Sequence, residues 1–148
     1  MNRSLMGALA LTFAAAAWSQ AAAPSDFAAK AAKEPGAQVT PSGLVFRSLK
    51  DGSGASPQAT DKVRVHYRGT FPDGKEFDSS YARGQPAEFP LDRVIKCWTE
   101  GVQKLKVGGK AKLTCPPGIA YGARGAGGVI PPDATLQFEV ELLGIAGR

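Results

Sequence analysis

Short stretches of alternating apolar and polar residues dominate the chain from residue 40 onwards. Such alternation places every second side chain on one face, which is typical of a β-strand buried on one side only. In the stretch KVRVHYRG, for example, Val63, Val65 and Tyr67 share the apolar face. The pattern predicts long strands over residues 62–69, 110–115 and 135–142, and shorter extended pieces over 44–46, 76–78 and 86–91.

Only one segment beyond residue 40 has the periodicity of a helix. Residues 94–105 (VIKCWTEGVQKL) repeat apolar side chains at helical spacing, among them Trp98, Val102 and Leu105. One short helix among strands that are joined by short turns predicts an α+β domain. We expect an antiparallel sheet of five to six strands wrapped around this helix.

The N-terminal residues have a different pattern. Arg3 precedes an unbroken apolar run from Leu5 to Ala17, and small residues follow the run. This order is typical of a secretory signal peptide, and the run is too short to span the roughly 30 Å of hydrocarbon in a bilayer. We expect cleavage after Ala21, with Ala23 as the other cleavage position that fits. A buried Ala-rich helix and a retained signal anchor are the lesser alternatives.

The predicted organisation is a signal peptide over residues 1–21, a flexible tether over 22–39 and a single domain over 40–148. The tether is rich in Ala, Lys and Pro, and it has room for a turn or two of helix before Pro35-Gly36 ends it. A signal peptide places the protein in the periplasm or outside the cell. No cysteine stands directly after the apolar run, so a lipid anchor is not expected.

The net charge of +5 does not by itself indicate a nucleic-acid partner. Four lysines lie two or four residues apart around a Gly-Gly turn, which is typical of solvated faces: Lys104, Lys106, Lys110 and Lys112. An exported protein also rarely meets nucleic acid. An anionic cell-envelope surface is the charged partner that the composition allows.

The chain has two cysteines, Cys97 and Cys115. In an oxidising compartment they are candidates for one disulfide, which would contribute about 3 kcal/mol for a loop of this length. Two buried free thiols are the alternative. With a single histidine, His66, and no paired cysteine spacing, we expect no metal site and no cofactor. His66 alternates with inward residues, so we expect it to point outward.

Common catalytic motifs are absent from the sequence, including the nucleophile elbow, the phosphate-binding loop and the zinc-protease helix. The glycine-rich run from Gly122 to Gly128 does not have the spacing of a dinucleotide-binding turn. What remains is a set of aromatic and branched apolar residues around short loops.

Four segments together resemble the FKBP family of peptidyl-prolyl cis-trans isomerases, in particular the catalytic domain of exported bacterial, Mip-like members. They are residues 65–80 (VHYRGTFPDGKEFDSS), 94–102 (VIKCWTEGV), 120–122 (AYG) and 130–143 (IPPDATLQFEVELL). Each segment alone is a weak signal, but all four occur in one unbroken order. The resemblance covers residues 40–145, so it identifies the predicted domain as an FKBP-type isomerase domain.

The resemblance implies an active site in an aromatic pocket with Trp98 as its floor. The implied catalytic set is Tyr67, Phe77, Asp78, Trp98, Tyr121 and Phe138, and the implied substrate-binding set is Arg83, Phe89, Val94, Ile95 and Ile130. Asp78 would lie at the rim, where Arg83 can pair with it. The backbone N–H of Ile95 and the hydroxyl of Tyr121 would donate hydrogen bonds to ligand carbonyl groups.

The implied activity is isomerisation of X-Pro bonds during the folding of exported proteins, without a covalent intermediate. Its partners would be unfolded or partly folded proline-containing polypeptides, and macrolide inhibitors of the tacrolimus or rapamycin type would compete for the pocket. Ala87 and Ala126 stand where family members often carry bulkier residues, which would open the rim. A non-catalytic proline-binding chaperone or assembly module using the same pocket is the alternative. We expect a monomer, because the tether is too short for the helical dimerisation region of some exported relatives.

Overall fold

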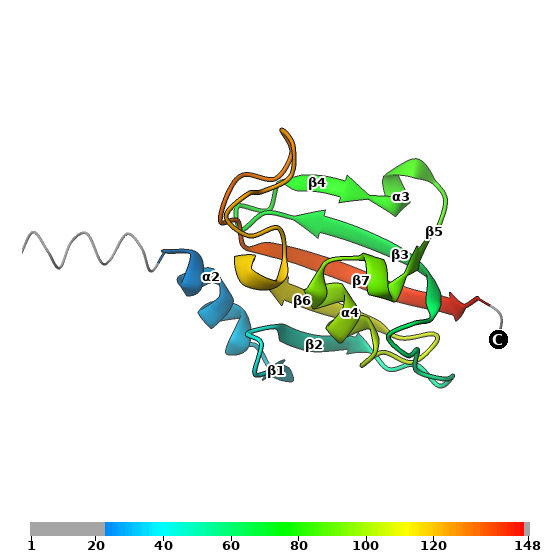
Figure 1. Cartoon of the computed structure of the whole chain (residues 1–148). Helices are drawn as coiled ribbons and strands as arrows, with labels where there is room; N and C mark the ends of the chain where they lie inside the picture. Colours follow the sequence, from blue (N-terminus) through cyan, green and yellow to red (C-terminus); the bar gives the residue numbers. More distant parts are fainter. Residues whose placement is uncertain (1–22, 147–148) are drawn as a thin grey trace, which may run out of the picture.

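The computed structural model describes residues 23–146, so the predicted signal peptide lies outside the described residues. Seven antiparallel strands form one sheet, which holds a short helix against one face (Figure 1). The elements are α2 (Ala23–Ala32), β1 (Ala37–Val39), β2 (Val45–Lys50), β3 (Lys62–Thr70), β4 (Glu76–Ser79), α3 (Ser80–Arg83), β5 (Ala87–Pro90), η1 (Leu91–Arg93), α4 (Lys96–Val102), β6 (Lys110–Cys115), η2 (Pro117–Ile119) and β7 (Leu136–Ile145). No helix in this part of the chain is long and apolar enough to cross a membrane.

The sheet brings together strands that are far apart in the sequence. Its order is β1-β2-β6-β7-β3-β4, and β5 also pairs with β3. Strand β3 pairs with three other strands: β7 runs along one of its edges, while β5 and β4 share the other. Gly69 of β3 pairs with Phe138 on one side and with Asp78 on the other. Residues from three strands therefore meet at this point of the sheet.

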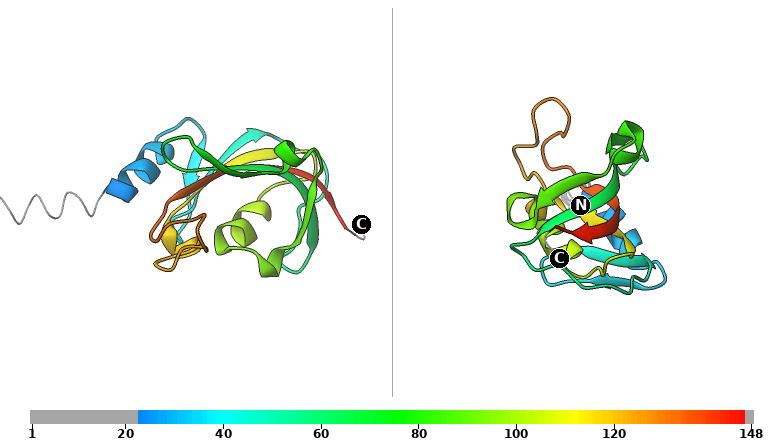
Figure 2. Two further views of the ribbon diagram at one scale, coloured as in Figure 1. Left: turned by 90° about the horizontal axis from the view of Figure 1, so that it is seen from above. Right: turned by 90° about the vertical axis from the view of Figure 1, so that its right-hand side faces the viewer.

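The sheet arches over α4 (Figure 2). The helix turns Cys97, Trp98, Gly101 and Val102 inward, and all four are buried. Gly101 allows the close approach of helix and sheet, since a Cβ atom there would lie 2.8 Å from a methyl carbon of Leu113 on β6. Larger residues at this position would push α4 away from the sheet.

The helix is shorter than the predicted span of residues 94–105. Val94 and Ile95 have extended backbones, with ψ angles of 175° and 151°, and α4 begins only at Lys96. The carbonyl of Ile95 accepts hydrogen bonds from the N–H groups of Trp98 and Thr99, at 3.0 and 3.2 Å. Ile95 is therefore the residue that caps the helix, and its own N–H lies outside the helical hydrogen-bond pattern.

The prediction of a flexible tether over residues 22–39 is corrected by the structure, in which α2 and β1 occupy this segment. Ala31 of α2 is only 6% exposed, and the amino group of Lys112 lies 3.0 and 3.1 Å from the two carboxylate oxygens of Glu34. Tertiary contacts add to the weak local propensity of a short helix, which the sequence pattern alone does not reveal. Strand β1 also makes the sheet one strand larger than the five to six predicted.

Candidate functional site

A cavity of about 450 Å³ opens between the concave side of the sheet and the start of α4. Its lining comes from β3, β4, β5, β7, η1, the extended residues before α4, α4 itself and the loop after η2. The lining residues are Tyr67, Phe77, Asp78, Phe89, Arg93, Val94, Ile95, Trp98, Tyr121 and Phe138. Most of these side chains are apolar and aromatic, which is typical of a small-ligand site.

Trp98 lies at the centre of an aromatic cluster. Its ring meets the rings of Tyr67, Phe89 and Phe138 nearly at right angles, with centroids 5.1 to 5.5 Å apart. Phe77 in turn meets Phe138 edge-on at 5.6 Å. Edge-to-face packing is the favoured arrangement for aromatic pairs, so each ring helps to fix its neighbours. The cavity consequently has a rigid floor, and Trp98 is only 4% exposed.

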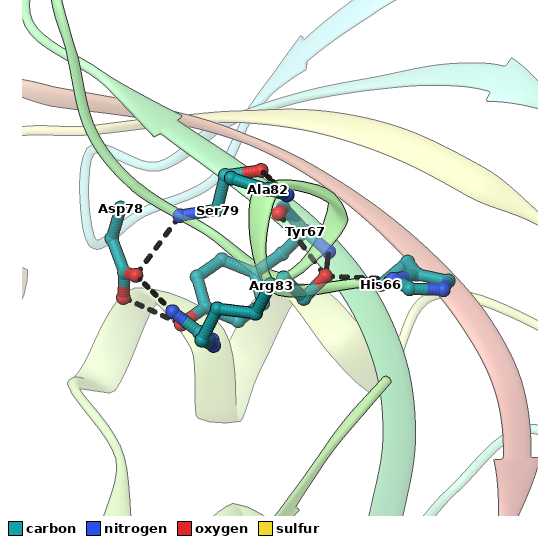
Figure 3. A network of polar contacts seen from close by, with 7 residues as sticks. His66, Tyr67, Asp78, Ser79, Ala82 and Arg83 are labelled. Atoms are coloured by element: carbon teal, nitrogen blue, oxygen red, sulfur yellow. Dashed lines mark hydrogen bonds and ion pairs between the residues drawn. The ribbon is translucent and has the colours of Figure 1, made fainter. Parts of the chain in front are cut away.

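Three polar side chains close one side of the cavity (Figure 3). The hydroxyl of Tyr67 donates a hydrogen bond of 2.5 Å to Asp78, and Arg83 donates to the other carboxylate oxygen at 2.6 Å. Arg83 also donates to the Tyr67 hydroxyl at 3.0 Å. Burial and the hydrogen bond to Asp78 raise the pKa of Tyr67, so its hydroxyl keeps its proton.

Asp78 is the acidic member of this group. Partial burial alone would raise the pKa of its carboxyl, but the hydrogen bonds from Tyr67 and Arg83 outweigh burial and hold the pKa below its usual value. The carboxylate is therefore ionised at neutral pH and acts only as an acceptor. It holds the Tyr67 ring in place and has no proton to give.

The short helix α3 is fastened to β3 at its first residue. The buried hydroxyl of Ser80 accepts a hydrogen bond from the backbone N–H of Tyr67 at 2.7 Å, and it lies 2.8 Å from Nδ1 of His66. The preceding Ser79 caps the helix, since its side chain accepts a hydrogen bond from the N–H of Ala82. These contacts hold α3 against β3 and thereby fix the position of its last residue, Arg83, at the rim of the cavity.

Three hydrogen-bond donors at the cavity have no partner within residues 23–146. The first is the backbone N–H of Ile95, which neither α4 nor any strand uses. The second is the hydroxyl of Tyr121, whose residue is 41% exposed. The buried Nε1–H of Trp98 is likewise unpaired in this part of the chain. An apolar cavity edged by unpaired N–H and O–H groups suits a ligand that carries carbonyl groups.

The structure brings most of the predicted site residues to one cavity. All six members of the predicted catalytic set line it, as do Phe89, Val94 and Ile95 of the substrate-binding set. Arg83 lies behind the rim, bonded to Asp78. Ile130 is not among the lining residues: its backbone pairs with Ala126, and its side chain is buried in the core.

Sequence reasoning did not identify Arg93 as a site residue, although its side chain lines the cavity. Arg93 ends η1, one residue before the extended Val94. The one feature of the sequence that indicates Arg93 is its position directly before residues 94–102, one of the four segments that carry the family resemblance. Outside the cavity, His66 is half-buried and stacks on Tyr81, with centroids 4.6 Å apart.

Cys97 and Cys115 form a disulfide whose Cα atoms are 5.9 Å apart. It joins α4 to the end of β6, and both cysteines are fully buried. Because Cys97 directly precedes Trp98, the bond ties the floor of the cavity to the sheet. Among residues 23–146, His, Cys, Asp and Glu side chains nowhere gather in a group of three that could hold a metal ion.

Comparison with known proteins gives a consistent result. Residues 54–143 match the model of the family described as FKBP-type peptidyl-prolyl cis-trans isomerase. The chain is 56% identical over 114 residues to the FKBP-type 22 kDa peptidyl-prolyl cis-trans isomerase of Escherichia coli, covering 77% of this chain and 55% of that protein. It is 54% identical over 103 residues to FK506-binding protein 1 of Dictyostelium discoideum, covering 68% of this chain and 96% of that protein.

The fold is similar to a solved structure as well. A crystal structure of a peptidyl-prolyl cis-trans isomerase from Pseudomonas syringae pv. tomato superimposes with a TM-score of 0.78 at 41% identity, covering 83% of this chain and 90% of that chain. The chain spans about half the length of the Escherichia coli relative. The likeness to that relative therefore concerns only about half of its length.

Proposed function

The chain belongs to the FKBP-type peptidyl-prolyl cis-trans isomerase family, and on that premise we propose that it catalyses the isomerisation of X-Pro bonds in polypeptides. The observation that carries the proposal is the aromatic cavity with Trp98 as its floor and unpaired donors from Ile95 and Tyr121 at its edge. A proline ring suits the aromatic floor, and its neighbouring carbonyl groups suit the donors.

The reaction explains why such a cavity is sufficient. Rotation about a peptide bond faces a barrier of about 18–20 kcal/mol, because the amide loses its resonance on the way. No bond breaks, so neither a nucleophile nor a general base is needed. The site has only to bind the twisted amide better than either planar form. The twisted amide has lost part of its carbonyl dipole, so it loses less than the planar form when it leaves water for an apolar cavity.

We assign the side chains the following roles. Trp98 and the aromatic walls hold the proline ring, while the N–H of Ile95 and the hydroxyl of Tyr121 each bind a carbonyl of the substrate. Asp78 and Arg83 are positioning residues, because their hydrogen bonds hold the Tyr67 ring against the cavity. Each tenfold acceleration requires only about 1.4 kcal/mol of preferential binding to the twisted amide.

A protease-coupled assay on a short Xaa-Pro peptide tests this function. We expect Tyr121→Phe to lower kcat/KM about three- to tenfold, the effect of one lost hydrogen bond. Phe77→Ala should lower it by more than about 30-fold, because the wall of the cavity is lost. Circular dichroism and a melting curve show whether each variant remains folded. A folded wild type that binds proline peptides without raising the isomerisation rate would instead identify a non-catalytic binding module.

We further propose that the protein is exported, acts as a monomer and assists the folding of other exported proteins, with the compartment being the periplasm or the cell exterior. Support comes from the apolar N-terminal run behind Arg3 and from the disulfide, which is typical of oxidising compartments. Mass analysis of the protein recovered outside the cytoplasm tests export, with a chain that begins at Ala22 as the expected result. Size-exclusion chromatography with light scattering tests the monomer.

Macrolides of the tacrolimus or rapamycin type are proposed to compete for the cavity. Ala87 and Ala126 are small, half-buried and not among the residues that line the cavity, so bulkier residues at these positions would offer such ligands more apolar contact. We expect Ala87→Phe to raise macrolide affinity while leaving the binding of a short peptide less changed. Isothermal titration of the wild type and of Ala87→Phe with both ligands shows whether the affinity for the macrolide changes more than the affinity for the peptide.

A further inference from the structure

The outward side of α4 forms a groove of about 840 Å³. The helix and the turn after it contribute Lys96, Thr99, Glu100, Gln103 and Lys104 to this groove. These residues recur three and four apart, so they share one face of the helix, opposite the buried face that carries Trp98. Figure 2 shows that the sheet covers α4 from one side and leaves the other side uncovered by strands.

The groove lies next to the aromatic cavity. Val94 lines both hollows, so it stands between them. At the other end of the helix, Lys104 is shared with a third hollow of about 520 Å³, which is also lined by Lys50 and Lys106. The three neighbouring hollows therefore mark a path over the surface, from the proposed X-Pro site past Val94 and along α4 to a lysine cluster.

The far end of this path is basic. Lys50, Lys104 and Lys106 are all exposed, and none of them is in an ion pair within residues 23–146. The acidic residue in the same hollow, Asp51, accepts a hydrogen bond from Ser48 at 3.0 Å. Three lysines around one hollow favour a negatively charged occupant.

The part of the path beside α4 has mixed charge. Lys96 lies there together with Asp92 and Glu100. The carboxylate of Glu100 accepts a hydrogen bond of 2.5 Å from Ser42, which satisfies part of its charge within the protein. Val94 and the buried Ile119 supply apolar wall. An extended polypeptide of mixed composition fits this stretch, whereas an acidic side chain fits the lysine cluster.

We propose that the surface along α4, from Val94 before the helix to Lys104 after it, is an extended substrate subsite, which guides one flank of a client polypeptide to the lysine cluster and favours acidic residues there. The inference rests on the proposed isomerase function, because the chain on either side of a bound X-Pro bond has to leave the cavity over its rim. The helix has seven residues and is about 10 Å long, so an extended chain passes it in about three residues. The favoured acidic residues lie roughly four to six positions from the proline.

Peptides of one length with a single X-Pro bond test the subsite by exchange NMR. They carry a Glu-Glu, Gln-Gln or Lys-Lys pair roughly five positions from the proline, in one series before it and in another after it. In one of the two series, we expect the Glu-Glu peptide to have a KM about two- to tenfold lower than the Gln-Gln peptide, with kcat unchanged. The difference should shrink as salt is added, because exposed charges are screened.

A charge-reversed variant locates the effect. In Lys104→Glu/Lys106→Glu, the preference for Glu-Glu should disappear or change to Lys-Lys. The matched control, Lys33→Glu/Lys75→Glu, makes the same change in net charge at exposed lysines away from the path and should keep the preference. Equal KM values for all peptides in both series would overturn the proposal, as would an equal loss of preference in both variants.

The proposed function is tested separately in the same experiment. A short peptide that has no flank to reach α4 is isomerised by the wild type if the aromatic cavity is the active site. If the short peptide is isomerised and the extended peptides show no charge preference, the subsite alone is excluded. If the wild type isomerises no peptide at all, the isomerase assignment fails with it.

Discussion

Asp78 at the rim of the cavity links pH to stability. Because hydrogen bonds from Tyr67 and Arg83 lower its pKa in the folded protein, folding favours the ionised carboxylate. The resulting stabilisation is fully present above the usual Asp pKa of about 3.9 and is lost as the pH falls through the lower, folded-state value. The carboxylate thus stabilises the folded rim at neutral pH but not in strong acid.

Replacing Asp78 by Asn should expose this dependence. We expect Asp78→Asn to lower the free energy of unfolding by about 1 kcal/mol at neutral pH, a small effect because the rim is partly solvated. The difference from the wild type should narrow below about pH 4, where the carboxylate of the unfolded wild-type chain takes up a proton while the folded one is still ionised. Urea unfolding between pH 3 and pH 7 measures it. A difference that stays constant down to pH 3 would contradict a lowered pKa.

Gly69 provides a second test, because the aromatic walls lie directly against it. A Cβ atom at this position would lie 2.6 Å from a ring carbon of Phe77 and 3.0 Å from one of Phe138. We therefore expect Gly69→Ala to displace both rings and to lower kcat/KM at least about tenfold, which corresponds to a loss of about 1.4 kcal/mol in transition-state binding. The peptide assay measures the activity, and tryptophan fluorescence reports on the floor.

The matched control for Gly69 is Gly144, another strand glycine. No atom lies within 4 Å of the position where its Cβ would stand, so Gly144→Ala should keep the activity within about twofold. Equal effects of the two substitutions would show that the aromatic walls do not depend on the space that Gly69 leaves. This dependence was not visible in the sequence, where Gly69 is one glycine among several and its neighbours Phe77 and Phe138 come from other strands.

At the scale of elements, alternation predicted most strands well. The predicted span 110–115 coincides with β6, and the span 62–69 differs from β3 by one residue. Buried and more exposed residues alternate along β3 and over the first four residues of β6, so their pattern has the period of two that a sequence reveals directly. The helix was predicted too long, because apolar residues at positions 94 and 105 have helical spacing although only Lys96–Val102 is helical.

The disulfide acts at the same scale, since it connects α4 to β6. The Cys97→Ala/Cys115→Ala double variant should lower the free energy of unfolding by about 3 kcal/mol, because the unfolded chain regains the entropy of a loop across 18 residues. Denaturant titration of the oxidised wild type, the reduced wild type and the double variant measures this. Reduction and the double variant should agree to within about 1 kcal/mol, apart from the small cavity left by the lost sulfur atoms. Identical stability of the oxidised and reduced protein would mean that the bond adds nothing to the fold.

At the scale of the whole molecule, the two faces of the sheet contact different parts of the chain. Leu113 of β6 contacts α4 on the concave face, whereas its neighbour Lys112 points to the other face and pairs with Glu34 of the N-terminal segment. The sequence predicted the concave face from motifs that lie in order along the chain. It could not predict how the N-terminal segment packs, because the contact between Glu34 and Lys112 joins residues 78 positions apart and leaves no local pattern.

This separation predicts that α2 can be released from the sheet without loss of activity. Ala31 is buried in the contact, whereas Ala29 on the same helix is exposed, and lysine replaces alanine in a helix at little cost in propensity. Ala31→Lys should therefore release α2, either by adding bulk and charge to the contact or by competing with Lys112 for Glu34, and Ala29→Lys should leave α2 in place. Hydrogen exchange of the amides in residues 26–34 should accelerate only in Ala31→Lys, while kcat/KM on a short peptide stays within about twofold in both variants. A large loss of activity in Ala31→Lys would show that the N-terminal helix supports the aromatic cavity through the sheet and that the two faces are coupled.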